Sequence, residues 1–485
     1  MASYNKTAAG VYKTTNISGH EAYVLDDKVK LATMALTTML GEPKYYGDNT
    51  DELIKLARKV AETDGEFVAK MAVWARCEGN MRSISHALLS VVANVNHGTD
   101  YVRKATRKVA MQRGDDGVET LATYKALYGK PFPHAMIRGV GDAMGQMSPN
   151  AVAKYQLDEK SFKLRDALRV CHPVPKGQKT SDAFKALVDG DLKAADGWKT
   201  AVQGGNNNAE TWDRLMSERK LGYMATLRNL VNIVKTGADV DRALALIADP
   251  DEVRKSRQLP FRYWSAYKSL KSHNLLSTKV TRAIDAALIA SCDNVERLPG
   301  RTAVLIDSSG SMGYKVSENS ESSCFEIAAL LGAMFTHISD DAWVSVFSTH
   351  AEKVDLMGTS VLSDMARIPF HNGGTNMMAG FELLCRSGFD ADRVIVLSDN
   401  EVNGGGGWWG RRSGTQVVQA GLDKYRAMRG HDVWCHAIDL MGYGTSQFIG
   451  PKVNVMAGWS DKVLGFVSRV ENGSSLVAEI ESIQL

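Results

Sequence analysis

Apolar residues recur at helical spacing through the first three-fifths of the chain. The stretches 26–40, 50–63, 65–77 and 82–95 each place apolar side chains at positions i, i+3, i+4 and i+7, which is the pattern of an amphipathic helix. Similar stretches continue to residue 292, and Asp, Ser, Thr or Gly stands near most junctions, as helix caps and turns require. Only helices are therefore expected before residue 295, stacked in pairs without a regular sequence repeat.

The pattern changes at residue 302. Short apolar runs rich in β-forming residues cover 302–307, 342–348, 393–399 and 432–438, and helical stretches lie between them at 324–338, 377–388 and 415–428. This alternation predicts a doubly wound, mostly parallel sheet. The predicted fold is thus an N-terminal extension (1–24), an all-helical domain (25–297) and an α/β domain (298–485). Residues 186–210 are polar and are expected to form an exposed loop.

Charge divides the chain at the same place. The whole chain has a net charge of +3, but residues 1–300 carry +10 and residues 301–485 carry −7. A basic half favours a polyanionic partner, and an acidic half favours a cation site. The six cysteines form no CxxC pair, and neither a signal peptide nor a membrane span is apparent, so buried reduced thiols in a cytoplasmic protein are expected.

Oxygen-bearing side chains gather at the ends of the predicted strands. The first strand runs into Asp307, Ser309 and Ser311, while Thr375 and Asp399 follow in the segments GGTNM and LSDNE. Ligands bind outside the carboxyl ends of strands in such sheets, and hard oxygen donors suit Mg²⁺ or Mn²⁺. The sequence therefore predicts a divalent-cation site at this edge.

The ordered set of five residues resembles the metal-ion-dependent adhesion site of von Willebrand A domains. The resemblance implies that Ser309, Ser311 and Thr375 coordinate Mg²⁺ directly, and that Asp307 and Asp399 act mostly through bound water. It also implies that a carboxylate from a partner fills the sixth position. An A-type fold that makes no functional use of its metal is the alternative.

Catalytic motifs are lacking, so no enzyme is expected. The segment DSSGS lacks the spacing of a nucleophile turn. The glycines of GVGDAMG (139–145) follow no strand, and the loop 403–414 lacks the Lys-Ser/Thr ending of a phosphate-binding loop. That loop follows Asp399, so its Trp408, Trp409, Arg411 and Arg412 either contact a partner at the metal face or fold back onto the domain.

A basic stripe marks the segment 161–177. Leu164, Ala167, Leu168 and Cys171 form one apolar face of its predicted helix, while Arg165, Arg169 and His172 share another face. Pro173 and Pro175 end the helix, which leaves His172 at its C-terminal end. Two guanidinium groups and an imidazole suit phosphate contact and base stacking, although a solvated basic face is the simpler interpretation. Further cations surround the stripe: Lys154, Lys160, Lys163 and the basic runs 102–109 and 253–258.

The same segments resemble the Ro autoantigen family, in which a TROVE module precedes a von Willebrand A domain. Segments that carry the resemblance are spread over about 450 positions: LGEPKYYGD (40–48), LRDALRVCHPVP (164–175), ATLRNLVNI (225–233), LPFRYWSAYKSL (259–270), LPGRTAVLIDSSGSM (298–312), GGTNM and SDNE. The resemblance implies a closed, monomeric ring of HEAT-like helical pairs. His172 matches the family's RNA-contacting histidine, and Lys154, Lys160, Arg165 and Arg169 lie in the matching neighbourhood.

The function that the resemblance implies is non-catalytic RNA binding. Small structured non-coding RNA of the Y RNA type would bind the outer surface, and single-stranded 3′ ends of misfolded RNA would pass through the basic hole. By analogy with bacterial relatives, an exoribonuclease is an implied partner. The alternative is a protein–protein adaptor whose metal site holds an acidic partner. The excess of positive charge on the helical half favours RNA binding.

Overall fold

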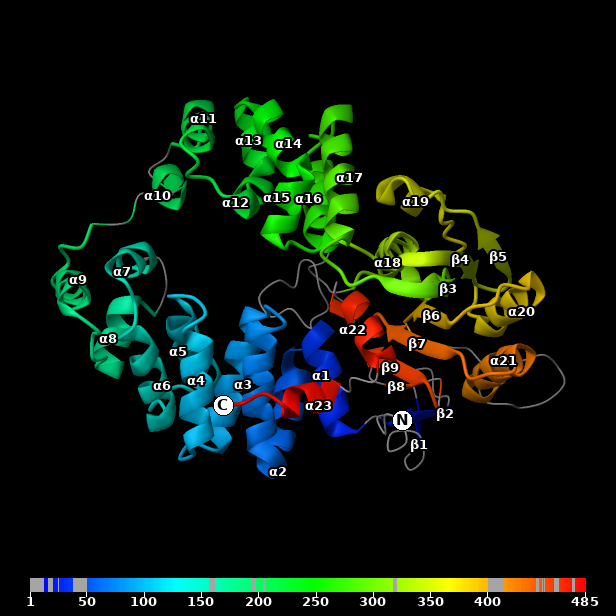
Figure 1. Cartoon of the computed structure of the whole chain (residues 1–485), viewed down its shortest axis with the longest axis horizontal. Coiled ribbons are helices and arrows are strands. Elements are labelled where there is room, and N and C mark those ends of the chain that lie inside the picture. The colour runs from blue at the N-terminus through cyan, green and yellow to red at the C-terminus, as the bar shows by residue number, and fades with distance from the viewer. Residues whose placement is uncertain are drawn as a thin grey trace.

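The helices and the main sheet are arranged in a closed circuit, in which two helical arms meet the α/β domain (Figure 1). This computed structural model describes residues 13–15, 21–24, 26–37, 50–156, 162–193, 195, 198–203, 206–316, 321–399, 414–441, 445–446, 448, 450–457, 462–472 and 476–485. The predicted segment 40–48, Lys160 and the loop 403–414 lie outside the described residues. None of the described helices is long and apolar enough to span a bilayer.

Helices fill the chain from residue 27 to residue 292. They are α1 (Asp27–Thr37), α2 (Thr50–Cys77), α3 (Arg82–Val95), α4 (Asp100–Ala110), α5 (Asp116–Tyr128), α6 (His134–Met144), α7 (Pro149–Tyr155), α8 (Leu164–Cys171), α9 (Gln178–Asp189), α10 (Trp198–Gln203), α11 (Ala209–Ser217), α12 (Tyr223–Arg228), α13 (Leu230–Thr236), α14 (Val240–Ala248), α15 (Pro250–Ser256), α16 (Pro260–Ser272) and α17 (Thr278–Cys292). In Figure 1, α2 to α9 form one arm of the circuit and α12 to α17 form the other.

The second part is an α/β domain of the predicted kind. It contains β3 (Leu298–Asp307), a short 3-10 helix (Gly310–Gly313), α18 (Cys324–Ile338), β4 (Ser339–Phe347), β5 (Ala351–Val354), α19 (Val361–Arg367), α20 (Met377–Ser387), β6 (Arg393–Ser398), α21 (Gly414–Arg429), β7 (Trp434–Asp439), β9 (Val453–Ala457), α22 (Lys462–Glu471) and α23 (Leu476–Glu481). The six strands have the order β5-β4-β3-β6-β7-β9, and all pairs are parallel except β4 with β5. The predicted fold class is confirmed.

Alternating side chains of the central strand serve two apolar layers. Val304 and Ile306 belong to a core that includes α18 and α22 and continues into the helical arms. Ala303 and Leu305 belong to a second core against α20 and α21. Because both faces of the sheet are covered, the strands are apolar on both sides, which is why they appear in the sequence as continuous apolar runs.

Strands also occur near the N-terminus, where only helices were expected. β1 (Lys13–Thr15) pairs antiparallel with β2 (Glu21–Val24), and β2 pairs with β8 (Thr445–Ser446) of the α/β domain. The expectation was wrong here because these strands are too short to show a period of two. They lie within the predicted N-terminal extension and form a small sheet with β8.

Two smaller expectations also need correction. The polar stretch 186–210 is not one loop, since it contains the end of α9 and the short helix α10 before α11 begins. Cys77 is exposed at the end of α2, whereas the other five cysteines are buried as expected. In addition, the two helices expected at 50–63 and 65–77 form a single element that kinks at Asp64, whose side chain accepts a hydrogen bond from Phe67 N at 3.0 Å.

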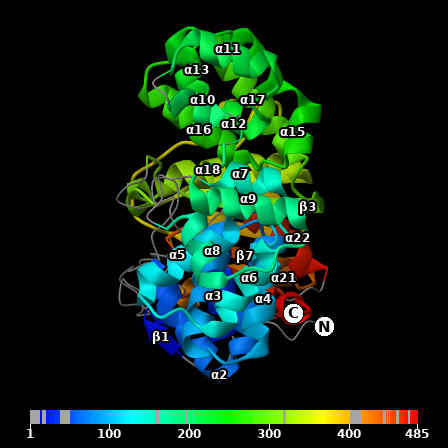
Figure 2. The same cartoon turned by 90° about the vertical axis from the view of Figure 1, so that its left-hand side faces the viewer.

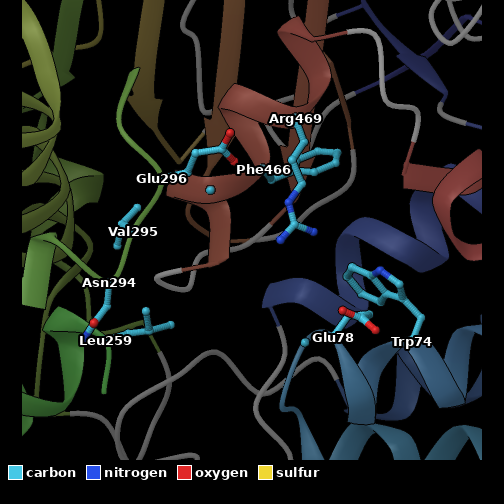
Figure 3. Close-up of a pocket in the computed structure, with 10 residues that line it drawn as sticks. Trp74, Glu78, Leu259, Asn294, Val295, Glu296, Phe466 and Arg469 are labelled. Carbon is cyan, nitrogen blue, oxygen red and sulfur yellow. The ribbon is translucent and has the colours of Figure 1, made fainter. Parts of the chain in front are cut away.

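The circuit closes where α22 and α23 meet α2. A cavity of about 110 Å³ marks this seam, lined by residues from α2, from the α17–β3 connection and from α22. In Figure 3, Trp74 of α2 and Arg469 of α22 lie across the cavity from Leu259 and Asn294. At the other junction, Lys268 of α16 forms an ion pair with Glu326 of α18 at 2.8 Å. The α/β domain is thus held against both helical arms.

A buried ion cluster holds three helices of the first arm together. Asp116 at the start of α5 is fully buried and accepts hydrogen bonds from Arg76 Nε of α2 and Arg82 Nε of α3, both at 2.8 Å. His86 Nε2 lies 3.3 Å from the same carboxylate. Burial raises the pKa of Asp116, but the His86 hydrogen bond and the charges of Arg82 and Arg76 outweigh this and lower it to about 2.

We expect Asp116→Ala to destabilise the fold by about 3–5 kcal/mol, because it leaves Arg76 buried without its partner. Chemical unfolding followed by circular dichroism measures this, with the exposed Asp100→Ala as a control that should change little. A lowered folded pKa stabilises the fold above the unfolded value of about 3.9, and this contribution is lost as pH falls toward 2. Asp116→Asn should lack that acid-dependent component, and equal acid sensitivity of both proteins would contradict the assignment.

Candidate RNA-binding face and metal centre

Helix α8 carries the predicted basic stripe. It begins after Lys163, whose backbone N–H donates to the carboxylate of Asp166 at 2.9 Å. Its apolar face is buried as predicted, through Leu164, Ala167, Leu168 and Cys171. Figures 1 and 2 show α8 at the end of the molecule far from the α/β domain. The stripe and the metal edge are therefore separate features of the surface.

The opposite face of α8 presents its cations to solvent. Arg169 and His172 are exposed and Arg165 is half-buried. Within the part of the chain that the structure describes, neither arginine forms an ion pair. Lys154 is also exposed, on the neighbouring α7, and its Nζ lies 5.4 Å from the centroid of the Tyr155 ring. Lys163 is half-buried at the start of α8.

Other basic runs of the helical half are partly neutralised, although the exposed Arg107, Lys108 and Arg257 form no ion pair with a described residue. In the run 102–109, Arg103 pairs with Asp142 at 2.9 Å and Lys104 pairs with Asp100 at 2.9 Å. In the run 253–258, Arg254 pairs with Asp251 and Lys255 pairs with Glu252. Hydrogen bonding to Glu252 raises the pKa of Lys255. These runs fit the simpler interpretation of a solvated surface, which separates them from α8.

The C-terminal end of α8 has an unusual backbone. His172 adopts the left-handed conformation, with φ of 44°, and its N–H donates to Leu168 O at 3.0 Å. Pro173 and Pro175 follow, and the helix ends where they predict. Lys176 N then donates to Gly145 O of α6 at 2.8 Å. The segment after α8 is thus fixed against α6.

The glycines of GVGDAMG explain how this contact forms. A Cβ at Gly141 would lie 3.0 Å from Cys171 O, and one at Gly145 would lie 2.2 Å from Val174 O. A Cβ at Gly139 would lie 2.6 Å from Arg103 O of α4. The motif is therefore a helix that packs closely on its neighbours. The sequence excluded a dinucleotide-binding loop here but did not predict this packing role. The spacing of the glycines was the only feature of the sequence that indicated it.

The metal edge lies at the carboxyl ends of β3 and β6. Asp307 ends β3 and is fully buried, accepting hydrogen bonds from Ser309 N at 2.8 Å and Ser398 Oγ at 2.7 Å. Ser398 directly precedes Asp399, which is also buried. The Oγ atoms of Ser309 and Ser311 lie 3.3 Å apart. The parallel pairing of β3 with β6 thus brings these residues to one edge.

The loop that carries Thr375 is attached to the same edge. Gly310 N donates to Gly373 O at 2.8 Å, and Asn372 N donates to Ser308 O at 3.0 Å. Gly373 allows this approach because a Cβ there would lie 2.4 Å from Ser348 Oγ. Thr375 follows two residues later and is buried. The structure therefore gathers all five predicted metal-site residues onto two adjoining loops and one strand end.

The electrostatics of this edge fit a divalent cation. Burial and, after it, the nearby carboxylate of Asp399 together raise the pKa of Asp307 to about 7, although hydrogen bonds from Ser309 and Ser398 oppose the rise. Two close, buried carboxylates beside hydroxyl groups form an all-oxygen donor set of the kind that Mg²⁺ prefers. Among the described residues no cluster of three or more His, Cys, Asp or Glu side chains suits a metal. The donor set here contains only two such residues, the others being hydroxyls.

Comparison with known proteins identifies a TROVE segment. The TROVE domain family model matches residues 190–307, from the end of α9 to the end of β3. Telomerase protein component 1 of Rattus norvegicus is 34% identical over 92 residues, and its Mus musculus counterpart is 33% identical over 82 residues. The chain therefore contains a segment that matches the TROVE domain family.

The match to these relatives is confined to a segment. It covers 18% and 16% of this chain, but only 4% and 3% of the two telomerase components. The crystal structure of the Deinococcus radiodurans Ro (Rsr) protein has the same fold, with a TM-score of 0.63 and 19% identity, over 93% of this chain and 100% of that one. The TROVE match ends at Asp307 and does not include α8, whose role remains a prediction.

We expect Mg²⁺ or Mn²⁺ to bind at the metal edge with measurable heat, and Asp307→Ala to abolish that heat. The physical reason is the loss of one of two buried carboxylates. Isothermal titration calorimetry tests this, and metal should also raise the melting temperature of the wild type alone. RNA binding should survive the substitution, because α8 lies far from this edge.

Two further variants distinguish loss of the metal site from misfolding. Ser311→Ala removes only a half-buried hydroxyl and should weaken metal binding while leaving the melting temperature without metal unchanged. Asp341→Ala removes an exposed carboxylate near the amino end of β4 and should bind metal normally. Equal metal binding by wild type, Asp307→Ala and Ser311→Ala would show that the site is misplaced.

Proposed function

We propose that this protein is a non-catalytic RNA-binding scaffold. It binds small structured non-coding RNA of the Y RNA type and single-stranded 3′ ends of misfolded RNA, and it acts in RNA stability, quality control or decay. The observation that carries the proposal is the stripe on α8, where Arg165 and Arg169 form no ion pair with any described residue. Arginines at such positions are available for bidentate contact with phosphate.

The distribution of charge supports the same proposal. Residues 101–200 hold 18 Lys and Arg against 11 Asp and Glu, so most of the positive excess of the helical half lies in the arm that contains α8. A polyanion approaching this arm gains attraction at long range, whereas the acidic α/β domain repels it. RNA is thereby directed to the arm at the far end from the metal edge (Figure 2).

The metal edge has a separate proposed role. It holds Mg²⁺ through Ser309, Ser311 and Thr375, with Asp307 and Asp399 in support, and a partner's carboxylate completes the coordination. An exoribonuclease or another RNA-processing protein is the proposed partner class, in a cytoplasmic complex built on a monomeric ring.

A protein–protein adaptor is the second candidate function. Two large apolar residues are exposed beside the metal edge, Tyr314 at 72% and Phe370 at 41%. Phe370 packs against Phe325 in a tilted arrangement, with ring centroids 4.8 Å apart, and covers Gly313. Exposed aromatic residues next to a metal site suit a protein ligand. If the protein is an adaptor, its helices serve only as a scaffold. Its affinity for RNA would then be weak and would not change when the cations of α8 are replaced.

Filter binding at several salt concentrations tests the RNA-binding function. Affinity should fall steeply with salt, at a slope of about −0.7 per phosphate contact for single strands. Removing Arg165 or Arg169 should lessen that slope by about 0.7 each, and the triple alanine variant with His172 should lose about tenfold or more in affinity. His172→Ala alone should weaken structured RNA more than a generic single strand, because a ring at a helix end stacks or donates selectively.

A charge-matched variant provides the control. Lys104, Arg254 and Lys279 are exposed cations that already pair with Asp100, Asp251 and Asp241. Their triple alanine variant changes the charge by a similar amount and should bind RNA nearly as the wild type does. A flat salt dependence, or equal losses in both triple variants, would favour the adaptor function.

A further inference from the structure

The cavity at the seam of the circuit has room for a small ligand. Its volume is about 110 Å³. One water molecule needs roughly 10–15 Å³ of such volume, so the cavity holds several waters or one small organic molecule. Its walls come from the end of α2, from the α17–β3 connection and from α22, which are far apart in the sequence. A ligand bound here contacts all three parts at once.

Two carboxylates lie on different walls of this cavity. Glu78 directly follows α2, and Glu296 belongs to the α17–β3 connection. In Figure 3, Glu78 lies beside Trp74, and Glu296 lies across the cavity beside Val295. Both glutamates are exposed, and neither forms an ion pair with a residue that the structure describes. Their charges are therefore available to a ligand.

The guanidinium group in the lining is already paired. Arg469 Nη1 donates to Glu479 Oε1 at 3.0 Å, and the same oxygen accepts the N–H of Trp74 at 2.9 Å. Glu78, Glu296 and Glu479 provide three carboxylates against this one guanidinium, which leaves a net charge of −2 on these four groups. A negative potential of this kind attracts a cation and repels an anion.

The rest of the lining is apolar, which decides the kind of cation. Trp74 and Phe466 are buried large aromatic residues, and Leu259 and Val295 add aliphatic surface. A metal ion needs several oxygen ligands close together, and among the described residues no cluster of His, Cys, Asp or Glu meets that need. An organic cation gains twice, because its methylene groups cover the apolar walls and its ammonium group is attracted to aromatic rings.

We propose that this cavity binds a short aliphatic diamine. One ammonium group pairs with Glu78 and the other pairs with Glu296, while the methylene chain lies against Trp74 and Phe466. 1,4-Diaminobutane is small enough for the volume and has this distribution of charge. The bound diamine links the end of α2 to the α17–β3 connection and so holds the circuit closed. This inference does not depend on the proposed RNA-binding function.

Isothermal titration calorimetry of the full chain with 1,4-diaminobutane, at constant ionic strength, tests the proposal. The diamine should bind and should raise the melting temperature as its concentration rises. Glu78→Gln and Glu296→Gln should each weaken binding about tenfold or more, because each removes a charge-assisted hydrogen bond. 1-Aminobutane has the same carbon chain and a single ammonium group, so it should bind the wild type more weakly by a similar factor.

Glu62→Gln is the matched control, since Glu62 is an exposed glutamate of α2 outside the cavity lining. It should bind the diamine as the wild type does, and so should Asp307→Ala. Without ligand, Glu78→Gln and Glu296→Gln should melt as the wild type does, because their carboxylates have no ion pair to lose.

Three results would overturn the inference. The first is no binding by the wild type, or equal binding by the wild type, Glu78→Gln and Glu296→Gln. The second is equal affinity of the wild type for the diamine and for 1-aminobutane, a comparison that needs no variant. The third is loss of binding in Asp307→Ala alone, which would place the diamine at the metal edge. None of these results bears on RNA binding by α8, which filter binding tests separately.

Discussion

The carboxylate of Glu479 joins the two ends of the chain. Its Oε1 accepts hydrogen bonds from Trp74 Nε1 of α2 at 2.9 Å and from Arg469 of α22 at 3.0 Å. Glu481, one turn before the C-terminus, forms an ion pair with Lys28 of α1 at 3.0 Å. The last helix thus connects the first helices to the α/β domain.

The contact is effective because α22 is itself fixed to the sheet. Glu471 at its end pairs with Arg393 of β6 at 2.7 Å and with His436 of β7 at 2.9 Å. All three side chains are nearly buried, so the ion pair of Glu471 with Arg393 is little screened by solvent, while burial lowers the pKa of His436. A rigid connection therefore runs from the sheet through α22 and Glu479 to α2. It sets the distance between the acidic and the basic part of the molecule, and it keeps α8 away from the metal edge.

Much of this architecture could be predicted from periodicity alone. Helices α3 and α18 begin and end at the predicted residues, because their apolar positions follow helical spacing and each ends in a clear break. The short edge strands β5 and β9 were missed, since four or five residues cannot display a pattern distinct from a loop. The pairing of β2 with β8 joins residues more than 400 positions apart, about which local sequence carries no information.

The candidate sites, like the fold, could be predicted only in part from the sequence. The order of Asp307, Thr375 and Asp399 at strand ends sufficed to predict the metal edge, because parallel strands bring their carboxyl ends together whatever their separation in sequence. Only the fold shows that Gly373 and Gly310 attach one loop to the other. The basic runs show what the sequence alone could not predict. Composition makes the runs 102–109 and 253–258 as cationic as α8, and only the positions of Asp142, Asp251 and Glu252 distinguish them.

A count of Lys and Arg residues therefore overstates the positive charge that is available to bind phosphate. A lysine or arginine that already pairs with a carboxylate must lose that partner before it binds phosphate, so it contributes less to affinity than its formal charge suggests. Helix α8 differs because its acid, Asp166, serves as a cap at the N-terminal end, which leaves the C-terminal half to Arg169 and His172. The backbone carbonyls at that end add negative potential that favours cations there. The glycines of α6 then hold the following loop in place, so the same short segment is both basic and rigid. Rigidity and unpaired charge together, more than charge alone, make this segment of the helical half the best suited to bind RNA.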